Sequence, residues 1–542
     1  MDSKNKDNGS DIHFIGIVGL LFLGIAFQKF KIVFLKWYSN SINQNRVIGA
    51  VILILVLILI LFIQKYLKFA RLNQKEKLII GDEVDSVYCG KTVNQEIVFI
   101  KPRQRSMHTQ VIGTTNAGKT ESVILPWAIQ DIKAGRGLLL IDGKADNSLL
   151  NKLWSYSKKF GREKDFRLFS LSHLNFSWQF NPLIGGTAEE ITERVFNAFE
   201  FENPYYRSIQ YEVMGQIMRI LMKNKITPTF QNILQLIEDL SLLEKLAIRT
   251  SDPMTISWIQ KFKGLSASER DSRTSGLASA IGHFVYGKTG VLFNTEKESS
   301  TIDQALQKNL IVYFQLPVLL SPFLGKATGK LILQSLQAAV ANRHRKRGEN
   351  HKFFSVFLDD FSEYLYPGFV SVLNKSRSAN VGIVFAHQAL GDITQLGDSV
   401  ANAILTNSNL KVFMRGNDPD SAEYFSRMIG TKSSTKYTER QKSGFFNSKQ
   451  STGDLSARDV EEFVVHPNIF KRELGVGEAM MIIPHDGGSK TVRIKFDRYP
   501  DLTPDVLPII EKRCLDLIAC HKNKYELTEG IADLVINKSE VV

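Results

Sequence analysis

The stretch Val111–Ser122, VIGTTNAGKTES, decides the fold that we predict for this chain. It holds the pattern G-x-x-x-x-G-K-[ST], whose glycines let backbone N–H groups curl around phosphate oxygens. Lys119 supplies a compact positive charge for the β- and γ-phosphates, and the Thr120 hydroxyl can ligate Mg²⁺. The predicted phosphate-binding residues are Gly113, Thr114, Thr115, Asn116, Ala117, Gly118, Lys119 and Thr120. A β-prone run over 108–112 and a helical pattern over 121–132 flank this loop, which favours a strand, phosphate loop and helix over a chance match.

The strands that follow indicate an α/β fold. Apolar runs typical of buried strands are Gly137–Asp142, Phe166–Leu171, Leu310–Leu316, Phe353–Asp360, Val381–Gln388 and Leu410–Arg415. Between the second and third of them, from Thr187 to about Leu265, helical spacing continues without a strand. We therefore predict a nucleotide-binding domain over 71–185 and 268–500, interrupted by an all-α domain over 186–267. A short tail over 501–542 carries no site that we can identify.

Two strand ends complete the predicted nucleotide site. The run 353–360, FFSVFLDD, is an apolar strand that ends in two acids. Asp359 is expected to hold Mg²⁺ through water, and Asp360 to orient or deprotonate the attacking water. Glu363 is a weaker candidate for this base, and an acidic surface turn is the alternative to the whole pattern. Gln388 ends the next strand, where it can sense the γ-phosphate. The expected cofactors are ATP and Mg²⁺.

Several basic residues have more than one interpretation. Arg377 could reach across a subunit boundary as an arginine finger, with Arg415 as its rival and an ordinary surface arginine as the alternative. The run 343–347, RHRKR, fits the C-terminal end of a helix better than a DNA clamp. Residues 431–452 are rich in Lys, Ser, Thr and Gly, which predicts a flexible basic loop that either faces DNA or is simply solvated.

The N-terminus predicts a membrane anchor over residues 1–70. Val47–Ile63 is an unbroken apolar run without the polar face that a soluble helix would show. Phe14–Phe27 is shorter, but no cleavage site of a signal peptide follows it. We therefore expect a transmembrane hairpin with spans at about 12–28 and 47–64. An ATP-using body must face the cytosol, which places both termini inside.

Composition leaves the partner open. The 542-residue chain has a net charge of +13, which favours nucleic acid or anionic lipid, although a solvated basic surface is equally consistent with it. The three cysteines show no metal-ligand spacing, so we expect them to be reduced and expect no zinc site.

The ordered set of features resembles the coupling proteins of type IV secretion and conjugation, the TraD/TraG family within the FtsK/HerA-like motor ATPases. The matching pieces are the paired N-terminal apolar segments, Gly113–Thr120, Ile141–Lys144, Phe180–Leu183, the all-α insertion, Leu358–Phe361, Gln388, Ser456–Arg458 and Gly477–Ala479. The likeness runs from the first apolar segment to about residue 497. The family usually has Asp-Glu where this chain has Asp359-Asp360.

The resemblance implies a RecA-like P-loop ATPase anchored as a hexamer in the bacterial inner membrane, with ATP at its subunit interfaces. Such a ring receives a relaxase-bound single DNA strand, or protein, and passes it to the channel of the type IV secretion system. The all-α domain is expected to face the cytosol and recognise substrate. Two other readings stay open. One is an FtsK-like pump for double-stranded DNA, and the other is a nucleotide-binding scaffold that does not hydrolyse ATP.

Overall fold

The structure is a computed structural model that describes residues 85–201, 203–346, 351–443 and 449–502, together with positions 28, 29, 31, 32 and 59. The chain divides into two compact units, Met1–Lys77 and Leu78–Val542. Both predicted membrane spans and the tail beyond residue 502 lie outside the described residues, apart from those isolated positions. Within the described part, no helix is both long and apolar enough to cross a membrane.

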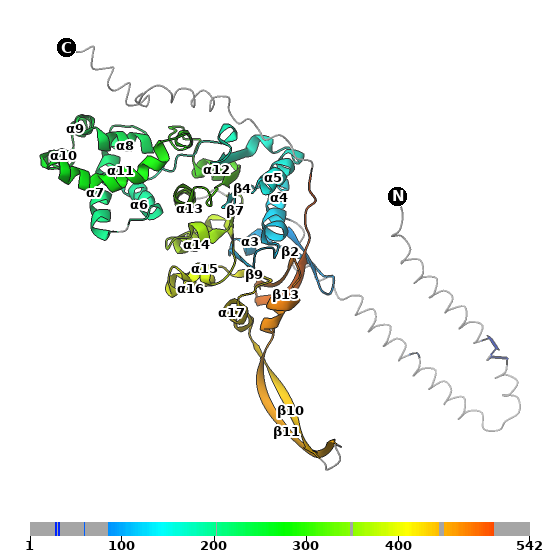
Figure 1. Cartoon of the computed structure of the whole chain (residues 1–542). Coiled ribbons are helices and arrows are strands. Elements are labelled where there is room, and N and C mark those ends of the chain that lie inside the picture. Colours follow the sequence, from blue (N-terminus) through cyan, green and yellow to red (C-terminus); the bar gives the residue numbers. More distant parts are fainter. Residues whose placement is uncertain are drawn as a thin grey trace, which may run out of the picture. The chain divides into compact units, whose positions relative to one another are not determined.

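An eleven-stranded sheet forms the centre of the second unit (Figure 1), with the strand order β2-β1-β13-β12-β9-β3-β8-β7-β4-β6-β5. From β9 to β5 all neighbours pair in parallel, whereas β12, β13, β1 and β2 add antiparallel strands at the other side. The bounds are β1 Val87–Thr92, β2 Ile97–Ile100, β3 Thr109–Ile112, β4 Gly137–Asp142, β5 Phe166–Ser170, β6 Ile311–Gln315, β7 Phe354–Asp359, β8 Val381–His387, β9 Leu410–Met414, β12 Glu478–His485 and β13 Gly488–Phe496.

The parallel strands are buried on both faces, which explains their unbroken apolar runs. In β4, Leu138 and Leu140 point into one core, whereas Leu139 and Ile141 point into another. Helices α4 (Leu125–Lys133) and α5 (Asn147–Lys159) contribute to the first core. The second core takes in α12 (Ile302–Lys308), α13 (Pro322–Arg345) and α14 (Phe369–Ser376). Figure 1 shows α4 and α5 in cyan and blue, apart from α13 and α14 in green.

The predicted helical insertion is present and is longer than 186–267. Its helices are α6 Ala188–Ala198, α7 Pro204–Lys223, α8 Phe230–Glu238, α9 Leu240–Arg249, α10 Pro253–Gly264 and α11 Ala267–Val285. Side chains of Thr, Asn, Asp and Ser cap the N-termini of all six. Helix α11 packs against α7 and α8, so the helical section continues past residue 267. Its core is continuous with the sheet, because Met214 and Ile217 share one cluster with Val312.

The prediction of a flexible loop over 431–452 is wrong. Thr431–Ser443 is a strand, β10, that pairs antiparallel with β11, Lys449–Phe463, as a separate two-stranded ribbon (Figure 1). The polar, turn-prone composition hid the strands, since a ribbon open to solvent on both faces needs no apolar alternation. We call β10 and β11 the ribbon below.

The basic run at the end of α13 is a helix end, as the sequence indicates. Helix α13 ends at Arg345, and the buried guanidinium of Arg343 donates to the carbonyls of Ala379 and Leu306. Arg343 is therefore a packing residue that ties α13 to its neighbours.

Candidate nucleotide-binding site

The site lies where four parallel strands end at one edge of the sheet. Ile112 at the end of β3 pairs with His387 at the end of β8, and Asp142 at the end of β4 pairs with Asp359 at the end of β7. Strand β8 lies between β3 and β7. The phosphate loop and the acidic strand end therefore flank a third strand end, that of β8, which carries Gln388.

The phosphate loop is held in shape by its neighbours. Gly118 and Asn116 take φ values of +98° and +65°, a left-handed conformation that glycine and asparagine adopt readily. The N–H of Thr114 donates to the carbonyl of Arg415 at 2.9 Å, and the carbonyl of Ala117 accepts from the N–H of Gly477 at 3.0 Å. The loop is thus fixed from two sides before α4 begins.

Lys119 is confined to this loop. Its ammonium donates to the carbonyl of Gly113 at 2.6 Å and to that of Thr114 at 3.3 Å. Burial lowers the pKa of Lys119, while the nearby charge of Asp359 acts in the opposite direction. The cation is therefore placed where phosphate oxygens would meet it, as the motif predicts.

The predicted Mg²⁺ ligands meet directly. The hydroxyl of Thr120 donates to Asp359 Oδ2 at 2.7 Å, although the two residues are far apart in sequence. Burial raises the pKa of Asp359, and the charge of Asp360 raises it further. A hydroxyl and a carboxylate at one point form an oxygen donor set that suits Mg²⁺.

Asp360 pairs with a lysine that we did not assign to the site. Asp360 has a φ of +48°, and its carboxylate lies 2.9 Å from the ammonium of Lys144. Glu363, the weaker candidate for the base, instead pairs with Lys326 at 3.3 Å.

Asp142 shapes the loop that carries Lys144. Its carboxylate accepts backbone N–H bonds from Lys144 and Asp146, at 2.9 and 2.7 Å, and a bond from the hydroxyl of Tyr313 at 2.8 Å. Burial raises the pKa of Asp142 to about 6. The acid at the end of the GLLLID run is the sequence signal for this second loop.

Gln388 lies beside the phosphate loop, with its carbonyl oxygen 3.5 Å from the hydroxyl of Thr115. Its backbone N–H donates to Asp392 Oδ2 at 2.7 Å. Asp392 was not predicted as a site residue. It holds the turn that presents Gln388.

The two candidate arginines lie at opposite ends of their strands. Arg377 is exposed and precedes β8, whereas Gln388 follows it. Seven residues of strand separate these ends, or about 20 Å. Arg377 is thus not brought to the phosphate loop of its own chain. Arg415 does adjoin this loop, which it holds through its backbone carbonyl.

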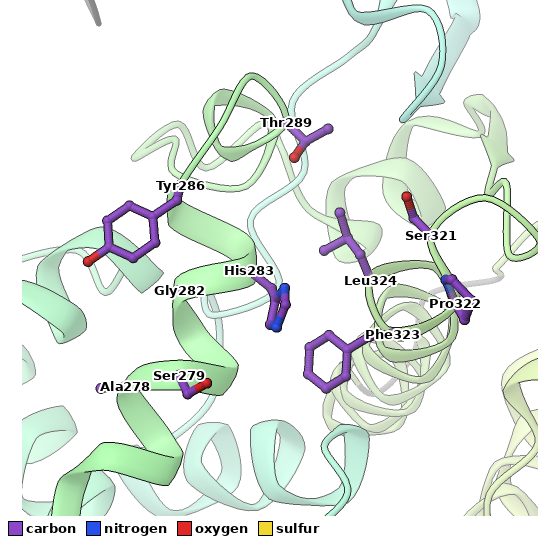
Figure 2. Close-up of a pocket in the computed structure, with 10 residues that line it drawn as sticks. All are labelled: Ala278, Ser279, Gly282, His283, Tyr286, Thr289, Ser321, Pro322, Phe323 and Leu324. Atoms are coloured by element: carbon purple, nitrogen blue, oxygen red, sulfur yellow. The ribbon is translucent and has the colours of Figure 1, made fainter.

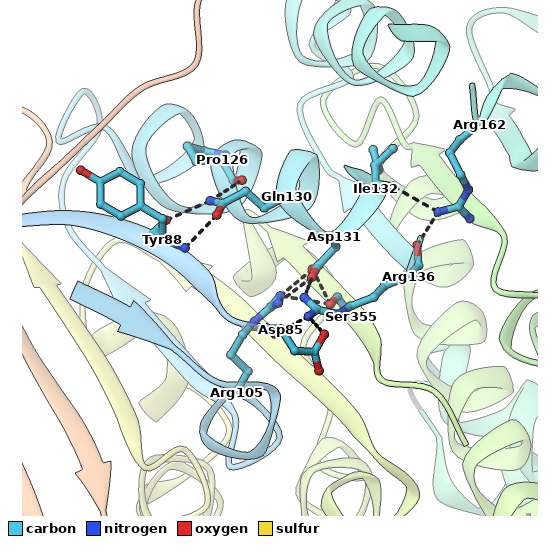
Figure 3. Close-up of polar contacts among 10 residues, drawn as sticks. All are labelled: Asp85, Tyr88, Arg105, Pro126, Gln130, Asp131, Ile132, Arg136, Arg162 and Ser355. Carbon is cyan, nitrogen blue, oxygen red and sulfur yellow. Dashed lines mark hydrogen bonds and ion pairs between the residues drawn. The ribbon is translucent and has the colours of Figure 1, made fainter. Parts of the chain in front are cut away.

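A buried charge cluster supports the site from behind (Figure 3). The guanidinium of Arg105 donates two bonds of 2.7 Å to Asp131 of α4, which also accepts from Arg136 at 2.9 Å and from Ser355 of β7 at 2.6 Å. Burial opposes ionisation of Asp131, yet the two arginines and Ser355 lower its pKa overall. This cluster ties α4, which follows the phosphate loop, to β7, which carries Asp359.

A separate cavity of about 610 Å³ lies between α11 and the start of α13 (Figure 2). The rings of His283 and Phe323 face each other there, with centroids 4.5 Å apart. Leu319 and Leu320 are almost fully exposed in the loop just before α13. Its lining contains no residue of the phosphate loop, so this cavity is not part of the nucleotide site.

The fold and the site define a P-loop nucleotide-binding protein with a RecA-like sheet. Residues 354–469 match a family model described as the TraM recognition site of TraD and TraG. The type 4 coupling protein DotL of Legionella pneumophila is 21% identical over 409 residues. That match covers 64% of this chain and 52% of DotL, so the chain spans about half the length of this curated relative.

Solved structures of the bacterial conjugative coupling protein TrwB share the fold. The unbound form lacking its N-terminal part aligns with a TM-score of 0.56 at 14% identity, covering 80% of this chain and 93% of that one. TrwB in complex with ADP and Mg²⁺ aligns with a TM-score of 0.55 at 14% identity, covering 78% of this chain and 92% of that one. The resemblance to TraD/TraG-type coupling proteins is confirmed.

Proposed function

We propose that this chain is the coupling ATPase of a conjugative type IV secretion system, which uses ATP hydrolysis to drive relaxase-bound DNA, and protein as well, into the transfer channel. The observation that carries the proposal is the 2.7 Å contact between Thr120 and Asp359, which joins the phosphate loop to the acidic strand end. The matches to DotL and TrwB support the choice of a coupling protein.

In this proposal each residue at the strand ends has one task. Lys119 binds the β- and γ-phosphates, and Thr120 and Asp359 hold Mg²⁺, which neutralises developing charge on the phosphates when bound. Asp360 orients and deprotonates the attacking water, while Gln388 positions it from the other side. Fixed charges of this kind stabilise the transition state because they need no reorganisation during the reaction.

The arginine finger comes from a second copy of the chain. Arg377 lies at the opposite sheet edge from its own phosphate loop, so it can complete only the site of a neighbour. Such an arginine contributes about 10³–10⁵-fold in rate. We therefore propose a ring, with six copies as in the family that the chain resembles.

We further propose that residues 12–28 and 47–64 anchor this ring in the bacterial inner membrane as a two-span hairpin. The unbroken apolar run at 47–63 supports this assignment. The ATPase body then lies in the cytoplasm.

A plasmid transfer assay tests the proposed function. In a donor strain whose own copy is replaced, Lys119→Ala should reduce transfer to the level of a strain without the gene. Lys133→Ala, on the exposed end of α4, is the matched control and should transfer normally. Normal transfer by the Lys119→Ala strain would contradict the proposal.

A nucleotide-binding scaffold without hydrolysis is the second candidate, and one observation favours it. The Asp360 carboxylate is shorter than the glutamate usual in the family and is engaged by Lys144 at 2.9 Å. On that reading ATP binding alone controls assembly, and Asp360→Asn leaves transfer unchanged.

A further inference from the structure

A line of buried side chains leads from the end of α16 (Asp398–Thr406) to the turn that carries Gln388. The ammonium of Lys411 lies 2.9 Å from Gln110 Oε1, and Gln110 Nε2 lies 2.9 Å from His387 Nε2. At its end, His387 Nδ1 lies 2.8 Å from the carbonyl oxygen of Ala389. Lys411, Gln110 and His387 are 4%, 0% and 1% exposed, so water does not compete for these bonds.

Lys411 is an unusual group to bury. Besides Gln110, its ammonium donates to the carbonyl of Leu405 at 2.6 Å and to the hydroxyl of Ser408 at 2.8 Å. All three donors are satisfied by neutral acceptors, and no carboxylate pairs with Lys411 in the part of the chain that the structure describes. The last turn of α16 favours a cation there, but burial still lowers the pKa of Lys411 to about 7.

The chemistry of these groups fixes the direction of every bond. An ammonium can only donate, so the carbonyl oxygen of Gln110 faces Lys411 and its NH₂ group faces His387. His387 Nε2 must then accept, which places the ring proton on Nδ1. That proton is donated to the carbonyl of Ala389. Burial lowers the pKa of His387 to about 4, with Lys119 and Lys411 lowering it further and Asp392 raising it, which keeps the ring neutral.

We propose that Lys411, Gln110 and His387 are positioning residues that lock the turn 387–389 and so aim Gln388 at the phosphate loop. The inference rests on the proposed role of Gln388. The carbonyl of His387 accepts from the N–H of Gly113 at 3.3 Å, and the N–H groups of Gln388 and Ala389 donate to Asp392. With the Ala389 carbonyl held by the His387 ring, only the side chain of Gln388 remains free to turn. Lys411 acts at a distance, because it sets the amide of Gln110 and thereby the His387 tautomer.

Two isosteric substitutions at His387 test the bond that matters. In His387→Asn the amide nitrogen replaces Nδ1 and can still donate to Ala389, whereas in His387→Gln it lies near the position of Nε2. We expect the full-length His387→Asn protein to keep kcat for ATP hydrolysis within about threefold, and His387→Gln to lose about 10- to 100-fold with KM nearly unchanged. Equal loss of kcat in both variants would overturn the proposal.

A second measurement does not depend on turnover. ¹⁵N spectra of the full chain labelled at histidine, with the His387 signal assigned from its loss in His387→Asn, report the tautomer directly. The proposal predicts a neutral ring protonated at Nδ1 in the wild type. In Gln110→Glu a carboxylate oxygen faces Nε2, so we expect Nε2 to become protonated.

These two readouts separate the inference from the proposed function. A wild type without ATPase activity, but with the Nδ1 tautomer and its shift in Gln110→Glu, would contradict the proposed hydrolysis and support the network. Protonation of His387 at Nε2 in the wild type would overturn the network whatever the activity.

Discussion

At the scale of single residues, Asp360 is the group on which the mechanism depends most. Its carboxylate pairs with Lys144, one residue beyond the Mg²⁺ ligand Asp359. We expect Asp360→Asn to lower kcat by about 100-fold or more while nucleotide affinity stays the same, because only the proton acceptor is removed. Asp360→Glu restores the acid usual in the family and should retain activity. Steady-state kinetics and nucleotide titration measure both, and full activity of Asp360→Asn would support the scaffold instead.

The buried cluster around Asp131 predicts a stability effect. Asp131→Asn leaves Arg105 without its buried anion, so we expect the free energy of unfolding to fall by about 3–5 kcal/mol. The control is Asp165→Asn, which breaks the partly exposed pair with Arg162 and should cost about 1 kcal/mol or less. Denaturant unfolding compares the two, and equal losses would contradict a structural role for the cluster.

The same cluster predicts a pH dependence. Because the pKa of Asp131 is lowered in the folded state, its contribution is present above the unfolded pKa of about 4 and is lost as pH falls below it. The wild type should therefore lose stability below about pH 4 more steeply than Asp131→Asn.

Residues in one contiguous motif could be predicted, and residues joined only by the fold could not. Gly113–Thr120, Asp359 and Gln388 are recognisable because each follows an apolar strand. Lys144, Asp392 and Lys411 were missed as site residues, since their roles come from contacts between strands distant in sequence. Local spacing carries no information about such contacts.

At the scale of elements, apolar runs predicted every strand of the parallel sheet, because a strand buried on both faces cannot be polar. The order of the strands was not predictable, as pairing of β3 with β8 and β9 spans hundreds of residues. The ribbon was mistaken for a loop because it has no buried face. The helical section was placed correctly at its start, but α11 extends it past the predicted end.

The ribbon carries a prediction for DNA binding. Strand β10 includes the cations Lys432, Lys436, Arg440 and Lys442. Replacing these four by serine should weaken single-stranded DNA binding and flatten its salt dependence by about 0.7 in log–log slope per lost phosphate contact. Basal ATP hydrolysis should not change. Fluorescence anisotropy across salt concentrations measures the slope.

The acidic residues of the partner strand provide the matched control. Glu461→Gln together with Glu462→Gln alters β11 without removing a cation, so the salt slope should not decrease. An unchanged slope in the four-serine variant would exclude the ribbon as a phosphate-binding surface.

At the scale of the whole molecule, the position of Arg377 predicts that sites are shared between copies. Arg377→Ala and Lys119→Ala should each be nearly inactive alone. A mixture should regain activity, because an Arg377→Ala copy keeps its phosphate loop and can receive Arg377 from a Lys119→Ala neighbour. Activity measured against mixing ratio should pass through a maximum between the two pure proteins. A strictly additive, inactive mixture would show that Arg377 does not act across copies.

The central claim is that the phosphate loop and the acidic strand end form an ATP-hydrolysing site that works in an assembly on DNA. The most direct test is ATP hydrolysis by the full-length protein over a range of protein concentrations, with and without single-stranded DNA. We predict turnover that rises more steeply than protein concentration, that DNA stimulates, and that Lys119→Ala abolishes. Turnover that Lys119→Ala leaves unchanged, or no turnover at any concentration with DNA present, would contradict the account.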